Sequence, residues 1–350
     1  YMKKLVVALL LASSYSFVFA DSKPTVDILA TGGTIAGVAT SASSTIYKAG
    51  SLDVKDLIGA VSGLDKLANL KYKQVYNKDS GDITLSDWTN LASQVQEAVN
   101  KSDINGVVIT HGTDTMEETA YFLSLVISTN KPIVLVGSMR PATAISSDGP
   151  LNLYNAVAVA ASPSSKDKGV IVAMNGDILS GRGVTKTNTI SVQTFKDLNA
   201  GPIGTVAMGS VNYNPTALSV KDSAPFKVNK DTKLPNVEIL YAYAGVDDNM
   251  WQKVLETPDL KGIVIAGVGD GNIPSYESDF LKKARAMGIV IVRSSRVGSG
   301  DVTYDYNNLD SQYDLIDANE LNPQKARILL MLSLLKTNKV KQIQEYFNEY

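Results

Sequence analysis

Residues 106–118 read GVVITHGTDTMEE, where a short apolar run leads directly into hydroxyl and carboxylate side chains. The β-branched run 106–110 is typical of a strand buried on both faces of a parallel sheet. Gly112 allows a tight turn, either Asp114 or Thr115 can cap the next helix, and the glutamates after them complement its positive end. Since ligands of open α/β sheets bind beyond the carboxyl ends of the strands, this segment predicts a functional site.

A helix cap alone also explains this polar cluster. Thr113, Asp114 and Thr115 are residue types that helix starts favour, so the segment by itself leaves both interpretations open. The choice between them depends on whether other strand ends carry similar residues.

A second apolar run, VDILA at residues 26–30, leads into TGGTIAG at residues 31–37. A glycine-rich turn after a first strand can also cradle a dinucleotide, but the spacing here is not G-x-G-x-x-G and no P-loop lysine follows. We therefore discount a nucleotide site. Two strand ends now offer threonine hydroxyls, which favours a catalytic or binding role.

The segment from Gly37 to Gly50 is small and polar, and Tyr47 is its single aromatic residue. This composition predicts a mobile lid with glycine hinges that closes over a ligand. A plain disordered surface loop is the alternative.

A third polar segment, GRGVTKTNT at residues 181–189, follows the apolar strand GVIVAM at residues 169–174. It places Lys186 among several hydroxyls. A lysine close to a threonine hydroxyl and an aspartate carboxylate can order a proton-transfer relay without any histidine. Because an isolated lysine is usually exposed to solvent, this pattern alone makes Lys186 only a candidate.

The composition removes several classes of enzyme and partner. The absence of cysteine excludes a cysteine nucleophile, a disulfide framework and a thiolate metal site. His111 is the only histidine, which argues against a histidine-based zinc site, and no G-x-S-x-G motif accompanies it. We expect it to be a hydrogen-bonded supporting residue. The net charge of −2, with no basic run among aromatics, argues against a nucleic-acid partner.

Taken together, these segments resemble the bacterial type II L-asparaginases, secreted amidohydrolases that convert L-asparagine to L-aspartate and ammonia. The similarity runs through essentially the whole mature chain. Its motifs, in order, are ILATGGT (28–34), HGTDTMEE (111–118), GSMRP (137–141), DGPLNL (148–153), RSSR (293–296) and LNPQKAR (321–327).

The resemblance implies a role for individual residues. Thr34 is implied as the primary nucleophile with Tyr47 as its proton partner, and Thr113, Lys186 and Asp114 as a second hydroxyl–amine–carboxylate triad. Backbone N–H groups beside the two threonines would stabilise the oxyanion, as amide hydrolysis requires. The implied substrate-binding residues are Gly33, Ser80, Gly81, Thr113, Asp114 and Ser138, with Asp114 and Ser80 on the amino and carboxylate groups. The resemblance also implies no cofactor or metal and a D2 homotetramer with active sites between subunits.

Three positions depart from the family pattern. Gly81 stands where relatives usually carry Gln or Glu, Gly245 where Asn or Ser is usual, and Asn307 where a carboxylate is usual. In relatives these side chains help to hold the substrate amino group, the last two from a neighbouring subunit. The site for the substrate ammonium is therefore expected to offer fewer charge-assisted contacts here, unless Asp305 or Asp247 substitutes.

The N-terminus predicts export. Two lysines precede an apolar run at residues 5–12, and small residues precede Asp21, so residues 1–20 read as a secretory signal peptide. Cleavage would change the net charge from −2 to −4, because both lysines are lost. A retained anchor is the alternative, but serines interrupt the apolar run. We expect a periplasmic protein without another membrane segment.

The rest of the chain is too long for a single ordinary core, so two domains are expected. Apolar runs alternate with helical patterns, which predicts α/β domains, each a mostly parallel sheet flanked by helices. Residues 21–213 form the larger, catalytic N-terminal domain, the Pro- and Lys-rich residues 214–236 a linker, and residues 237–350 the smaller C-terminal domain. Ser86 is the expected N-cap of a helix through Trp88 and Val99.

We therefore expect a periplasmic amidohydrolase that acts on L-asparagine through threonine chemistry. A periplasmic solute-binding protein for a small polar ligand shares the size, the signal peptide and the two α/β domains. An amidohydrolase that prefers another amide, such as L-glutamine, would use the same scaffold.

Overall fold

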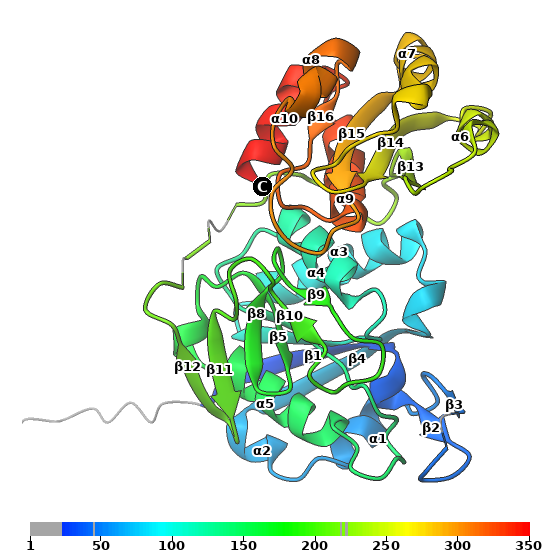
Figure 1. Cartoon of the computed structure of the whole chain (residues 1–350). Coiled ribbons are helices and arrows are strands. Elements are labelled where there is room, and N and C mark those ends of the chain that lie inside the picture. The colour runs from blue at the N-terminus through cyan, green and yellow to red at the C-terminus, as the bar shows by residue number, and fades with distance from the viewer. Residues whose placement is uncertain (1–22, 45, 218, 221–222) are drawn as a thin grey trace, which may run out of the picture.

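The computed structural model describes residues 23–44, 46–217, 219–220 and 223–350. The expected signal peptide lies outside these residues. Figure 1 shows a larger N-terminal domain, coloured blue to green, and a smaller C-terminal domain, coloured yellow to red. This two-domain α/β architecture confirms the fold class expected from the sequence.

The N-terminal domain is built on an eight-stranded mixed sheet. Five strands are parallel, and three further strands continue the sheet in antiparallel pairing on the β7 side. Across the sheet the strands are β12 (Ser210–Tyr213), β11 (Gly204–Ala207), β8 (Asp177–Ser180), β7 (Val170–Met174), β6 (Ile133–Val136), β5 (Gly106–Thr110), β1 (Thr25–Gly32) and β4 (Asn69–Lys78). The central strands β5, β6 and β7 are buried throughout, as their β-branched sequences require.

Helices cover both faces of this sheet (Figure 1). Helix α5 (Gly149–Ala161) packs on β5, β6 and β7, whereas α3 (Leu85–Asn100) and α4 (Met116–Val126) lie on the side of the C-terminal domain. The shorter helices are α1 (Val54–Gly59), α2 (Leu64–Leu67) and the 3-10 turns η1 (Thr34–Ala36), η2 (Ser80–Asp82) and η3 (Pro163–Ser165). Two small hairpins pair β2 (Val38–Ala39) with β3 (Tyr47–Lys48) and β9 (Thr185–Lys186) with β10 (Phe195–Lys196).

The N-cap expected at Ser86 was wrong. Thr84 caps α3, because its backbone is extended and its side chain accepts from Asp87 N. The Asp87 side chain accepts from Thr84 N in return, which completes a capping box. Ser86 lies in the first turn, where its backbone is already helical.

The C-terminal domain has a fully parallel sheet of four strands: β13 (Asn236–Tyr241), β14 (Leu260–Gly267), β15 (Val290–Ser295) and β16 (Ile316–Asp317). Its helices are α6 (Asp248–Val254), α7 (Ser278–Ala286), α8 (Leu309–Tyr313), α9 (Pro323–Leu334), α10 (Val340–Glu349) and the 3-10 turns η4 (Ser275–Glu277) and η5 (Tyr306–Asn308). None of the helices in the described part of the chain is long and apolar enough to cross a membrane.

Helix α9 joins the two domains. It packs against β13, β14 and β15 on one side and against α4 of the N-terminal domain on the other. Leu329, Leu330 and Leu332 are fully buried in a core that continues into the N-terminal sheet. The two domains therefore share apolar packing through this helix.

Candidate active site

The site is built where β1 and β5 end side by side. The two strands are parallel neighbours, with Ala30 opposite Thr110. Just beyond them the backbones of Gly33 and Gly112 come so close that a Cβ on Gly33 would lie 2.4 Å from Gly112 N. Only the absence of side chains permits this approach, which brings the segment of Thr34 next to that of Thr113.

Thr34 begins the turn η1 and is buried, with 7% of its surface exposed. Its Oγ1 lies 2.9 Å from the hydroxyl of Tyr47, a hydrogen bond in which either group can donate. Tyr47 stands on β3 and is 38% exposed. Residues 38–39 and 47–48 of this segment pair as the β2–β3 hairpin, labelled in Figure 1, and its Tyr47 side chain makes the hydrogen bond to the buried threonine.

The second group joins Thr113, Asp114 and Lys186, the three residues that the resemblance implies as a triad. The Lys186 ammonium donates to Thr113 Oγ1 at 2.9 Å and to Asp114 Oδ1 at 2.6 Å. The side chain of Lys186 is 17% exposed, whereas that of Asp114 is 66% exposed. The buried Thr113 is thus held by the Lys186 ammonium, while the Asp114 carboxylate that pairs with this ammonium faces solvent. An open cavity lies beside Asp114 and Lys186.

Ser80 docks the turn η2 against the same strand end. It is buried, its Oγ accepts from Asp114 N at 3.2 Å, and its carbonyl accepts from the Thr115 hydroxyl at 2.9 Å. This bond uses the hydroxyl of Thr115, the N-cap residue of α4, which makes no side-chain cap bond to the helix. Gly81 follows at the surface, where a Cβ would make only ordinary contact with Asp79 Oδ1 at 3.5 Å.

Ser138 is fully buried beyond β6, and its hydroxyl donates to Arg140 O at 2.7 Å. That bond commits its proton to the local turn. The described hydrogen bond of Ser138 therefore connects it neither to the Thr34–Tyr47 pair nor to the group of Thr113, Asp114 and Lys186.

Gly245 and Asn307 belong to the C-terminal domain. Gly245 has φ +75° with open space around it, and Asn307 Nδ2 lies 3.4 Å from Asn272 Oδ1. Figure 1 shows the neighbouring helices α6 and α8 far from the β2–β3 hairpin. Within one chain these positions therefore do not join the site. Asp305 is held by Ser311, whose backbone N–H donates to it and lowers its pKa.

His111 supports the turn from inside. It is fully buried, and burial lowers its pKa to about 4, so the imidazole is neutral. Because Gly112 O can only accept, Nδ1 donates to it at 2.7 Å, and Nε2 of the neutral ring accepts from the Thr119 hydroxyl, which itself accepts from Trp88 Nε1. The histidine thus fixes the Gly112 turn through a hydrogen bond, as the sequence analysis expected.

One residue at the site has a structural role that the sequence analysis did not predict. Glu117, expected only to complement a helix end, is 4% exposed and accepts bonds from Thr185, Lys186, Asn322 and Gln324. A glutamate within the buried start of α4 was the available signal, but its partners lie as far as 207 residues away. Among the described residues, no group of three or more His, Asp or Glu is arranged to hold a metal ion.

Two family models match this chain. Residues 25–219 match the model described as Asparaginase, N-terminal, and residues 236–347 match the model described as Glutaminase/Asparaginase C-terminal domain. Together they cover almost all the residues that the structure describes.

Individual proteins are similar over most of their length. L-asparaginase 2 of Escherichia coli (strain K12) is 47% identical, covering 93% of each chain. A probable periplasmic L-asparaginase of Haemophilus influenzae is 45% identical over 100% of this chain and 99% of that protein. A glutaminase-asparaginase of Pseudomonas fluorescens biotype A is 45% identical over 92% and 90%. The crystal structure of a probable cytoplasmic L-asparaginase from Campylobacter jejuni superposes with a TM-score of 0.89, 47% identity, and 94% and 100% coverage.

Proposed function

The chain belongs to the asparaginase family, and on this basis we propose that it hydrolyses the side-chain amide of L-asparagine to L-aspartate and ammonia. The observation that carries the proposal is the pairing of two buried threonines at adjacent strand ends, each with its own proton partner. The solute-binding alternative has no support, because both family models and the relatives named above are amidohydrolases.

We assign the nucleophile to Thr34. Its Oγ1 attacks the amide carbon, its proton passes to the Tyr47 oxygen as the Tyr47 hydroxyl hands its own proton on toward the leaving nitrogen, and backbone N–H groups beside the threonines stabilise the oxyanion. Collapse of the tetrahedral intermediate breaks the C–N bond, and the nitrogen, protonated by this relay, leaves as ammonia. Water then hydrolyses the acyl-threonine ester. The 2.9 Å hydrogen bond between the two hydroxyls supports this assignment.

We propose that the triad of Thr113, Lys186 and Asp114 directs proton transfer on the side of the substrate opposite Thr34. An ammonium that donates to Thr113 Oγ1 leaves the threonine proton free to point toward the substrate. Asp114 keeps Lys186 in place through Oδ1 and is proposed to receive the substrate ammonium on its other oxygen. Ser80, Gly33, Gly81 and Ser138 complete the proposed substrate-binding set.

Assembly and location belong to the same proposal. A homotetramer would allow the loops at Gly245 and Asn307 to approach a neighbour's site, since they lie away from the site of their own chain. Light scattering tests the tetramer. Export to the periplasm is supported by the sequence of residues 1–20 and by the name of the Haemophilus relative, whereas the Campylobacter structure is named cytoplasmic. N-terminal sequencing of the mature protein tests the cleavage before Asp21.

Ammonia release from L-asparagine, L-glutamine and D-asparagine tests the activity. We expect L-asparagine to be hydrolysed fastest, while the glutaminase-asparaginase relative makes L-glutamine the second substrate to examine. Thr34→Ala and Thr113→Val should each lower the rate by orders of magnitude with an unchanged circular dichroism spectrum. Near wild-type turnover in folded Thr34→Ala would reject the assigned nucleophile.

A further inference from the structure

The buried carboxylate of Glu117 connects the segment of the proposed catalytic lysine to the C-terminal domain. Its Oε2 accepts from Lys186 N at 2.6 Å and from Thr185 Oγ1 at 2.7 Å. Its Oε1 accepts from Gln324 Nε2 at 2.6 Å and from Asn322 Nδ2 at 3.0 Å. Each oxygen therefore has two donors, one pair from β9 and the other from the start of α9.

Burying a carboxylate costs free energy unless both of its oxygens accept hydrogen bonds. Glu117 meets this condition with four neutral donors, and Lys325 supplies a nearby positive charge. Burial lowers the pKa of Lys325 to about 8, and the Glu117 carboxylate opposes that fall. The two charges thus stabilise one another inside the junction between the domains.

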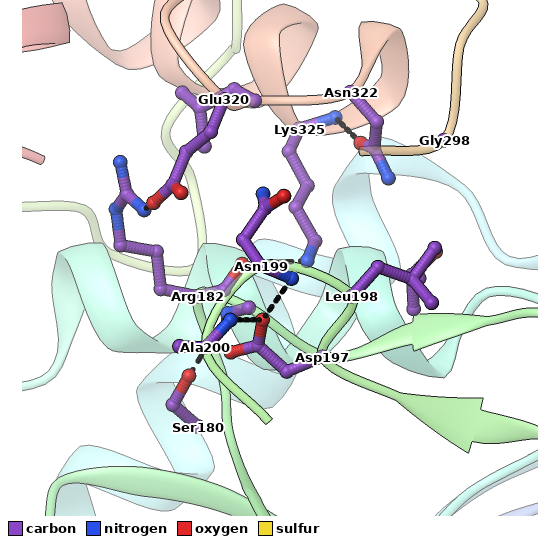
Figure 2. A pocket seen from close by; sticks show the side chains of 13 residues that line it. Ser180, Arg182, Asp197, Leu198, Asn199, Ala200, Gly298, Glu320, Asn322 and Lys325 are labelled. Atoms are coloured by element: carbon purple, nitrogen blue, oxygen red, sulfur yellow. Dashed lines mark hydrogen bonds and ion pairs between the residues drawn. The ribbon is translucent and has the colours of Figure 1, made fainter. Parts of the chain in front are cut away.

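Lys325 holds the same segment from its other end. Its Nζ donates to Arg182 O at 2.6 Å and to Val184 O at 2.5 Å. Figure 2 shows Glu320 paired with the Arg182 side chain across the junction. Residues 182–186 are therefore fixed at alternate points by groups from α9 and by the glutamate at the start of α4.

We propose that Glu117 is a positioning residue that sets the place of the Lys186 ammonium by holding its backbone and coupling it to α9. This inference rests on the proposed role of Lys186. Both Glu117 oxygens already accept two hydrogen bonds, so the residue does not take a proton from substrate. It acts through Lys186, whose ammonium must reach Thr113 and Asp114 at once.

The test begins with Glu117→Gln in the full-length protein. The glutamine amide fits the same space, but its NH2 group replaces an oxygen that accepts two hydrogen bonds. The bonds to either the β9 pair or the α9 pair of donors are therefore lost. We expect kcat for L-asparagine to fall about tenfold or more, while KM changes less than about threefold. The milder Gln324→Ala removes only one donor and should lower kcat in the same direction by less, which covers the case in which Glu117→Gln does not fold.

Asn199→Ala is the matched control, because it removes the hydrogen bond that Gly300 N donates to Asn199 Oδ1 between the domains, a contact that involves neither Glu117 nor residues 182–186. It should lower thermal stability but keep wild-type kcat. If it lowers kcat as much as Glu117→Gln does, loosened domain packing explains the effect and the inference is wrong.

A double-mutant cycle separates positioning from general structural damage. In a Lys186→Ala background, Glu117→Gln should cause no further loss of kcat, because the residue through which it acts is gone. Independent losses that multiply would overturn the inference. If Lys186→Ala itself turns over normally, the proposed function of the triad fails instead, and the two failures are distinguishable.

Discussion

Replacing Gly33 by alanine should disrupt the close approach of the two strand ends that form the site. Gly33 has φ +80° and ψ −174°, a region that costs other residues about 1–3 kcal/mol. A Cβ there would lie 2.4 Å from Gly112 N and Cα, where ordinary contact begins at 3.4 Å. The ends of β1 and β5 must therefore separate by about 1 Å, at a further cost of about 1–3 kcal/mol for overpacking.

Both stability and turnover report this change. We expect the free energy of unfolding to fall by about 2–6 kcal/mol, and kcat/KM for L-asparagine to fall about 100-fold, since a shift of about 1 Å between reacting groups has that effect. Urea unfolding and ammonia release at a temperature where the variant is folded measure the two. Gly59→Ala is the control, because nothing lies within 4 Å of its Cβ position. A folded Gly33→Ala protein with wild-type turnover would show that the spacing of the strand ends is not critical.

Three further outcomes are expected. Tyr47→Phe should lower kcat more than it raises KM, because the lost hydroxyl moves a proton; the reverse result in steady-state kinetics would make Tyr47 a wall of the pocket. Asn307→Glu should lower KM for L-asparagine about tenfold or more by restoring a charge-assisted bond to the substrate ammonium, and an unchanged KM would show that Asp305 or another group already supplies it. The free energy of unfolding should rise by about 3 kcal/mol from pH 4 to pH 6.5 through His111, since the unfolded state binds its proton more tightly than the native state. Urea titrations of His111→Gln should lack this part of the slope.

The strand ends were predictable because each is a local pattern. Runs such as 106–110 and 26–30 are short, largely apolar and reach a glycine within two residues of their end, so strand type and the position of the polar groups could be predicted from neighbouring residues. The contacts among Thr113, Asp114 and Lys186 required the family resemblance, since the lysine is 72 residues from the aspartate. The hydrogen bond from Thr34 to Tyr47 likewise depends on a hairpin whose strands are only two residues long.

The antiparallel edge of the N-terminal sheet was missed although a signal was present. Asn175 and Gly176 both have positive φ and join β7 to β8 in a two-residue turn. Asn-Gly between apolar runs is the strongest short-range sign of a hairpin. Met208 and Gly209 make the corresponding turn between β11 and β12, but methionine rarely adopts a left-handed backbone, so that turn could not be predicted.

The Thr34–Tyr47 pair and the group of Thr113, Asp114 and Lys186 are held by different parts of the fold, so a structural change can disrupt one without the other. The bond from Thr34 to Tyr47 rests on β1 and the β2–β3 hairpin, all within the N-terminal domain. Lys186, by contrast, lies in a segment held by Glu117 and by Lys325 of α9. Because α9 also carries the apolar packing shared by the domains, any change that shifts it should displace the ammonium while leaving the proposed nucleophile in place. The C-terminal domain would then act on catalysis within its own chain, in addition to any loops it offers to a neighbour.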